Sequence, residues 1–61
     1  MPVVQIDMLE GRTTEQKRAM VKQVTNAITE TCNCPADAVT IVIREISKQH
    51  FSEAGVLYSD K

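Results

Sequence analysis

The chain has 61 residues, of which 43% are hydrophobic and 25% charged, and its formal net charge is −1. This length excludes a two-domain enzyme and a large cavity enclosed by one chain, and the composition is typical of a globular domain rather than a disordered segment. The near-neutral charge argues against a nucleic-acid partner, and the absence of an apolar run of ~18 residues argues against a membrane span.

Residues 2–9 have the alternating pattern of a β-strand. One face carries Val4, Ile6 and Met8, and the other carries Val3, Gln5, Asp7 and Leu9. Pro2 suits a strand start because it has no N–H to donate. Residues 10–12 break the alternation, and Gly11 is a natural turn residue.

Thr13 and Gln16 have the spacing of a capping box, which predicts a helix from about residue 14 to about residue 31. We expect its apolar face to consist of Met20, Val21, Val24, Ala27, Ile28 and Thr31. We expect the opposite, solvent-facing side to consist of Lys17, Arg18, Lys22, Gln23, Asn26 and Glu30. Asn33 and Pro35 should end the helix, because Asn tolerates the left-handed conformation and Pro cannot continue a helix.

Residues 39–46 are rich in β-branched side chains and predict a second strand. The connection from the first strand has the length of a βα crossover, so we expect the two strands to be parallel. Gly55 marks a turn, and residues 56–58 predict a short strand that either closes a C-terminal hairpin or pairs with another subunit. The expected fold class is α+β, with a single β-α-β unit in one domain over residues 2–61.

The chain is too short to bury all of its hydrophobic residues alone. A chain of this size buries only about 60% of the surface that it exposes when unfolded. It has only two aromatic residues and neither a disulfide framework nor a metal motif to compensate. We therefore expect copies of the same chain to complete the core.

Most familiar catalytic constellations are missing. We find no Ser-His-carboxylate set around His50, the only histidine, and two glycines do not make a phosphate-binding loop. Cys32 and Cys34 have no second pair of ligands, so we interpret them as reduced helix-end thiols rather than a metal site. Reduced thiols and the lack of a secretory segment favour the cytoplasm. We interpret His50 as a surface residue.

Pro2 is the candidate catalytic residue. If Met1 is removed, as expected before a small second residue, the nitrogen of Pro2 becomes a secondary amine. A nearby cation and an apolar site would both lower the pKa of this amine, giving a neutral base or a nucleophile that forms an iminium. The alternative is that Pro2 only starts the strand. Arg12 either holds a carboxylate through its guanidinium or is a solvated residue near the helix start.

The opening Met-Pro-Val-Val-Gln-Ile-Asp-Met-Leu-Glu-Gly-Arg-Thr-Thr-Glu-Gln-Lys-Arg resembles the start of the 4-oxalocrotonate tautomerase family. The family pattern is Met-Pro, a hydrophobic strand, Leu-Glu-Gly-Arg, a polar cap and Glu-Gln-Lys. The similarity covers nearly the whole chain without gaps. It continues through Val24, Ala27, Ile28, Pro35, Glu45, His50, Phe51 and Gly55.

The resemblance implies a tautomerase-like subunit that assembles as a homohexamer. It implies a cofactor-free isomerase, active in aromatic-compound catabolism, that converts 2-hydroxymuconate-like dienols to conjugated 2-oxo-3-enoates. Pro2 matches the general base, and Arg12 matches the arginine that a neighbouring subunit places on the substrate's remote carboxylate. Phe51 matches the aromatic residue that keeps the pocket apolar, and Leu9 matches a substrate contact.

One position departs from the family pattern. Thr40 stands where the best-known members have a second arginine, which binds the near carboxylate. Arg44 follows on the same strand face, roughly 13 Å away at ~3.3 Å per residue. Both residues are candidates for substrate binding. Arg44 either enters the site from another subunit or is a surface or intersubunit salt-bridge residue.

Two other functions fit the same residues. A superfamily relative that hydrates or dehalogenates a small acid would use Pro2 as an acid and a carboxylate to activate water. The available carboxylates are Glu10, Glu45 and Glu53. A non-catalytic oligomeric binding protein would leave Pro2 with a structural role only.

Overall fold

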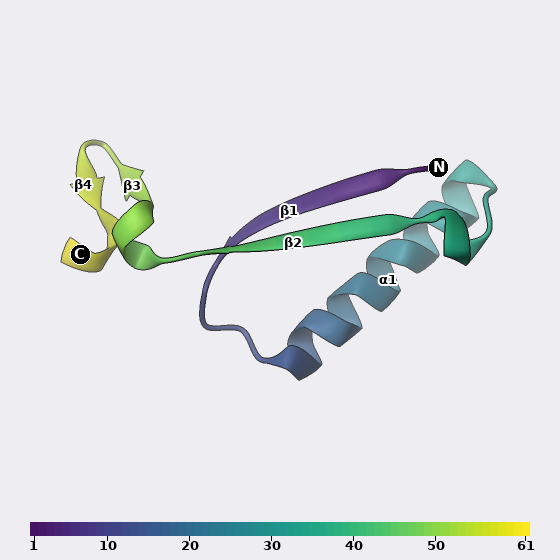
Figure 1. The fold of residues 1–61 in the computed structure, drawn as a ribbon, viewed down its shortest axis with the longest axis horizontal. Coiled ribbons are helices and arrows are strands. Elements are labelled where there is room, and N and C mark those ends of the chain that lie inside the picture. Colours follow the sequence, from purple (N-terminus) through teal and green to yellow (C-terminus); the bar gives the residue numbers. More distant parts are fainter.

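The computed structural model describes residues 1–61 and contains two strands joined by one helix, followed by a hairpin. Strand β1 (Val3–Leu9) leads to helix α1 (Thr14–Cys32) and strand β2 (Thr40–Ile46), and the hairpin consists of β3 (Ser52–Glu53) and β4 (Val56–Leu57). β1 pairs with β2 in parallel, and β3 pairs with β4 antiparallel. Figure 1 shows the hairpin at the end of the molecule opposite the N-terminus. The predicted α+β fold with parallel strands is confirmed.

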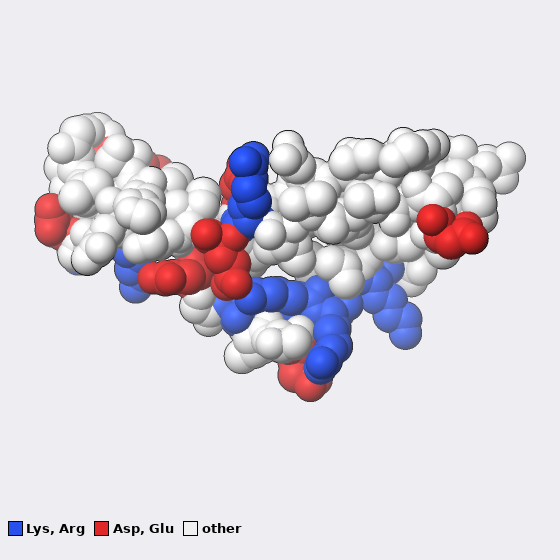
Figure 2. All heavy atoms as spheres, viewed as in Figure 1, with Lys and Arg blue, Asp and Glu red and all other residues white.

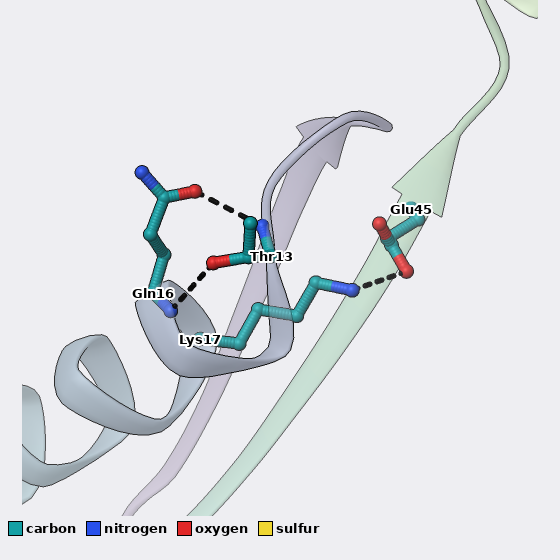
Figure 3. Close-up of polar contacts among 4 residues, drawn as sticks. All are labelled: Thr13, Gln16, Lys17 and Glu45. Carbon is teal, nitrogen blue, oxygen red and sulfur yellow. Dashed lines mark hydrogen bonds and ion pairs between the residues drawn. The ribbon is translucent and has the colours of Figure 1, made fainter.

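Local signals place both ends of α1. The backbone N–H of Gln16 donates to Oγ1 of Thr13 at 3.1 Å, and the N–H of Thr13 donates to Oε1 of Gln16 at 2.9 Å (Figure 3). Asn33 ends the helix in the left-handed conformation, with φ 53° and ψ 52°. The capping box and the Asn33 end are as predicted, and the helix extends one residue beyond the expected Thr31.

The two faces of the β1–β2 sheet have different environments. In the parallel register Val4 lies beside Ile41 and Ile6 beside Ile43, and these four side chains are half-buried on the face that α1 covers. The other face, which we call the outer face, carries Val3, Gln5, Asp7, Thr40, Val42 and Arg44, all of them exposed. The alternation predicted for residues 2–9 is therefore observed, but only one face has a cover within the chain.

Two expectations about α1 are wrong. Lys17 was expected on the solvent side, yet it is half-buried and its Nζ lies 2.7 Å from Oε1 of Glu45 on β2 (Figure 3). Ala27 and Thr31 were expected on the apolar face, yet both are exposed, and the hydroxyl of Thr31 donates to the carbonyl oxygen of Ala27. The physical reason is that two strands about 4.8 Å apart cover only a narrow stripe of the helix.

The C-terminal segment forms its hairpin within the chain. Ser52 pairs with Leu57 and Glu53 with Val56, so the predicted C-terminal hairpin is confirmed. Pairing of this segment with another subunit stays a prediction. Ala54 (φ 54°) and Gly55 (φ 80°) form the turn between them. Tyr58 begins a 3₁₀ turn (Tyr58–Asp60) rather than extending β4.

No residue of the single chain is buried, and the molecule is a plate of 43 × 23 × 13 Å. Val3 (57% exposed) and Val42 (41%) lie open on the outer face, and Val56 and Leu57 are open on the hairpin. Exposed large apolar side chains in two places, on the sheet and on the hairpin, are consistent with interaction sites. No helix is long and apolar enough to cross a membrane.

Candidate active site

Pro2 and Thr40 lie together at one end of the sheet, which we call the proline end. The backbone N–H of Thr40 donates to the carbonyl oxygen of Pro2 at 3.0 Å, which fixes Pro2 at the start of β1. Met1 is 88% exposed and therefore accessible for removal. Figure 2 shows mostly uncharged atoms over this end of the sheet, with one acidic group nearby.

Leu9 and Arg12 lie at the opposite end of the sheet, which we call the arginine end. Gly11, with φ 119°, turns the chain after β1, and Arg12 follows it. Arg12 lines a cavity of about 460 Å³ together with Leu9, Lys48 and Tyr58. It also lines a smaller cavity of about 210 Å³ against α1. The arginine end therefore combines a guanidinium with an apolar wall, as the binding of a small organic anion requires.

Phe51 stands behind Tyr58 rather than in the cavity wall. The two rings meet edge to face with centroids 5.6 Å apart, and the N–H of Tyr58 donates to the carbonyl oxygen of Phe51 at 2.7 Å. Tyr58 is therefore the aromatic residue that lines the Arg12 cavity in this chain. The sequence reasoning overlooked Tyr58 and Lys48. For Tyr58 a signal existed, since it is one of only two aromatic residues.

The two ends do not meet within one chain. From Pro2 to Leu9 the strand rises over about seven residues, or roughly 23 Å at ~3.3 Å per residue. Figure 1 shows the N-terminus and the turn after β1 at opposite ends of the strand pair. A ligand that contacts both Pro2 and Arg12 therefore requires these residues from two different chains.

Comparison with known proteins identifies the family. A family model described as "Tautomerase enzyme" matches residues 2–61. The chain belongs to the tautomerase family. It is 46% identical over 61 residues to a probable tautomerase of Bacillus cereus, with all of both chains covered. It is 45% identical over 60 residues to the 2-hydroxymuconate tautomerase of Bacillus subtilis, covering 98% of this chain and 97% of that one.

Solved structures agree with the sequence comparison. The crystal structure of YwhB, a homologue of 4-oxalocrotonate tautomerase, superposes with a TM-score of 0.92 at 43% identity and covers 98% of each chain. The resemblance to the 4-oxalocrotonate tautomerase family is thereby confirmed, and so is the prediction of an isomerase.

Arg44 of this tautomerase forms an ion pair within its own chain. Its Nε lies 3.0 Å from Oδ1 of Asp7, the residue beside it in the sheet register. Both side chains are more than half exposed, so the pair contributes about 0–1 kcal/mol to the stability of the single chain. Arg44 is therefore a surface residue of the single chain, and its salt bridge is formed within the chain rather than between subunits. Its entry into the site of another subunit stays a prediction.

The three carboxylates considered for water activation differ in their partners. Glu45 is bound by Lys17, and Glu53 is bound by Lys61 at 3.1 Å. Glu10 forms no ion pair and lines the Arg12 cavity. Glu10 is therefore the one candidate whose carboxylate remains available.

The remaining chemical groups do not gather into a site. Cys32 is exposed and Cys34 half-buried, and both are free thiols. No three His, Cys, Asp or Glu side chains are close enough together to hold a metal ion. His50 is exposed and lines a cavity of about 410 Å³ beside Asp7 and Arg44.

Proposed function

We propose that this tautomerase converts 2-hydroxymuconate-like dienols to conjugated 2-oxo-3-enoates, with Pro2 as the general base once Met1 has been removed. The observation that carries the proposal is the position of Pro2. Its carbonyl accepts the N–H of Thr40, which fixes Pro2 directly before β1, at an end of the sheet where mostly uncharged atoms lie (Figure 2). The name of the Bacillus subtilis relative supports the substrate class.

The reaction moves one proton and requires no cofactor. The nitrogen of Pro2 takes the proton from the 2-hydroxyl group, and the electron pair shifts through the diene so that C2 becomes a carbonyl. The same proton is then delivered to C5, which leaves the double bond between C3 and C4. A neutral amine suits this task because it accepts and returns a proton near neutral pH.

Arg12 and Thr40 are proposed to hold the two ends of the substrate. The Arg12 guanidinium binds the carboxylate next to C5 and so places C5 within reach of the proton. Thr40 has a neutral hydroxyl, which gives a weaker hydrogen bond to the near end of the substrate than a charged fork would. Leu9 and Tyr58 supply apolar walls, and Phe51 supports the ring of Tyr58. Arg44, bound to Asp7, is left on the outer face.

The proposed site requires assembly, and we propose a homohexamer. Three observations support assembly: no residue is buried in one chain, the outer face exposes Val3 and Val42, and the proline and arginine ends are far apart. A 4-oxalocrotonate tautomerase from Chloroflexus aurantiacus, 30% identical with a TM-score of 0.90, is described as a heterohexamer. Light scattering coupled to size-exclusion chromatography measures the number of chains directly.

The test is an ultraviolet assay of 2-hydroxymuconate ketonisation with the native protein and Pro2→Ala in parallel, after intact mass has confirmed removal of Met1. We expect Pro2→Ala to lose at least ~10²-fold in kcat, the contribution of a positioned acid–base group. A form with an uncleaved N-terminal extension is the control. The Pro2 nitrogen of this form is an amide and cannot act as a base, so we expect the extended form to be as inactive as Pro2→Ala. Full activity in either variant would contradict the role of Pro2.

A second function, hydration or dehalogenation of a small unsaturated acid, is favoured by one observation only. Glu10 is an unpaired carboxylate at the arginine end, where it could activate water. The same preparation is therefore assayed with 3-haloacrylates, and Glu10→Gln is compared with native protein. Halide release that depends on both Pro2 and Glu10 would show that the substrate is a haloacrylate rather than 2-hydroxymuconate.

A further inference from the structure

Two cations without partners line the same cavity. The chain has seven Lys and Arg side chains, and four of them, Lys17, Arg18, Arg44 and Lys61, form ion pairs. The three without an ion pair are Arg12, Lys22 and Lys48. Of these three, Arg12 and Lys48 both line the cavity of about 460 Å³ at the arginine end, and Lys22 does not.

The backbone brings these two cations to the same cavity. The N–H of Glu10 donates to the carbonyl oxygen of Ile46 at 3.0 Å, which joins the turn after β1 to the end of β2. Arg12 lies two residues beyond Glu10, and Lys48 lies two residues beyond Ile46. Lys48 begins a 3₁₀ turn (Lys48–His50) in which the N–H of His50 donates to the carbonyl oxygen of Ser47 at 2.8 Å.

The rest of the cavity suits an anion with an apolar body. Met8 and Leu9 provide apolar side chains, and Tyr58 provides a ring that packs against Phe51. Glu10 is the only carboxylate in the lining, so Arg12 and Lys48 together give the cavity a net positive charge. A planar dienoate with a charged end matches this combination.

We propose that Lys48 is a second carboxylate-binding residue, which acts with Arg12 on the substrate's remote carboxylate and makes the site selective for dicarboxylates. The Arg12 fork supplies two directed hydrogen bonds, and the Lys48 ammonium adds a compact charge on the same oxygen pair. Lys48 thus concentrates the positive charge at the end of the site away from Thr40. The proposal rests on the proposed function for the identity of the substrate.

The proposal predicts a specific kinetic signature. The remote carboxylate does not change during the reaction, so a contact to it stabilises the bound substrate and the transition state alike. Losing such a contact raises KM and leaves kcat unchanged. The loss is confined to substrates that carry the remote carboxylate.

The experiment compares Lys48→Met with native protein on 2-hydroxymuconate and on 2-hydroxy-2,4-pentadienoate, which lacks the remote carboxylate. We expect Lys48→Met to raise KM for the diacid about tenfold, the loss typical of a hydrogen bond to a charged group, with kcat within about twofold. KM for the monoacid should not change. Lys22→Met, which removes a cation outside the cavity, is the matched control and should behave as native protein.

Lys48→Arg should restore most of the native KM for the diacid, because it keeps the charge. An unchanged KM for the diacid in Lys48→Met would overturn the proposal. An equal rise of KM for both substrates would overturn it too, because it would indicate a structural effect. Circular dichroism and light scattering establish that each variant folds and assembles like native protein.

A binding experiment separates this proposal from the tautomerase reaction. (E,E)-Muconate and sorbate share the same six-carbon diene and differ by one carboxylate. Calorimetry should show that native protein binds muconate more tightly than sorbate. Lys48→Met should weaken the binding of muconate and leave the binding of sorbate unchanged. Failure of native protein to turn over 2-hydroxymuconate would reject the proposed substrate, whereas native-like muconate affinity in Lys48→Met would reject the role of Lys48.

Discussion

Thr40 donates its backbone N–H to the carbonyl oxygen of Pro2 at 3.0 Å, so these two residues are joined at the proline end by a bond that does not involve either side chain. The side chain of Thr40 is exposed on the outer face. A substitution of the Thr40 side chain therefore leaves in place the backbone bond that holds Pro2 at the strand start.

Thr40→Arg is expected to increase turnover of 2-hydroxymuconate. A guanidinium beside Pro2 would bind the near carboxylate and polarise the developing 2-oxo group, and both interactions are stronger than those of a neutral hydroxyl. We expect kcat/KM to rise about tenfold, the equivalent of ~1.4 kcal/mol. Thr40→Gln provides a long neutral side chain as the control. An equal gain in both variants would show that charge is not the cause.

Mixed assemblies of two inactive variants should recover activity. Pro2→Ala chains retain Arg12, and Arg12→Ala chains retain Pro2, so a site built from two chains can combine one intact residue from each. If the variants are unfolded together and refolded in equal amounts, random mixing restores about one quarter of the sites. Ketonisation of 2-hydroxymuconate measures the recovery. Each variant refolded alone is the control, and no recovery in the mixture would place both residues in one subunit.

The Asp7–Arg44 pair should contribute more to stability than a typical surface pair if copies of the chain cover the outer face. Removing one partner of a covered pair costs about 3–5 kcal/mol, whereas an exposed pair is worth about 0–1 kcal/mol. We expect Asp7→Ala to lower the thermal midpoint clearly and to promote dissociation on dilution.

Glu15→Ala is the matched control for Asp7→Ala. It breaks the Glu15–Arg18 pair on α1, whose side chains are 86% and 72% exposed. This pair joins residues three apart on one helix, so its loss should have a small effect. Equally small effects of both substitutions would indicate that the outer face stays in contact with water.

Thr13→Ala should destabilise the protein without altering the chemistry. The substitution removes the hydroxyl that accepts the N–H of Gln16, which leaves a donor at the start of α1 without its partner. Loss of such a cap costs about 1 kcal/mol per chain. Urea denaturation followed by circular dichroism measures the loss. Thr14→Ala, one residue later and outside the capping box, should have a smaller effect, and the reverse order would contradict this account.

The sequence predicted those features that depend on neighbouring residues. Thr13 with Gln16 and the left-handed Asn33 mark the helix ends, and the alternation of Val4 and Ile6 marks a strand with one covered face. These signals depend on residues only a few positions apart, and the observed ends of the elements lie within about one residue of the predicted ends.

The sequence did not reveal features that depend on distant pairing. Lys17 faces β2 because the two-stranded sheet covers a narrow stripe of α1, and the width of a sheet is not encoded in the helix itself. Lys48 shares a cavity with Arg12 where Glu10 bonds to Ile46, a contact between residues 36 positions apart. The edge-to-face contact between the rings of Phe51 and Tyr58 likewise depends on the hairpin, which brings Tyr58 back to Phe51.

The absence of any buried residue in the single chain makes protein concentration a thermodynamic variable of the fold. Under the proposed assembly, folding and association form one equilibrium, and mass action sets the fraction of ordered chains. Dilution would then act as a denaturant, and the thermal midpoint would rise with the amount of protein in the sample. Total activity would rise more steeply than in proportion to the concentration of the protein, because at low concentration a chain would lack both its partners and its own folded structure.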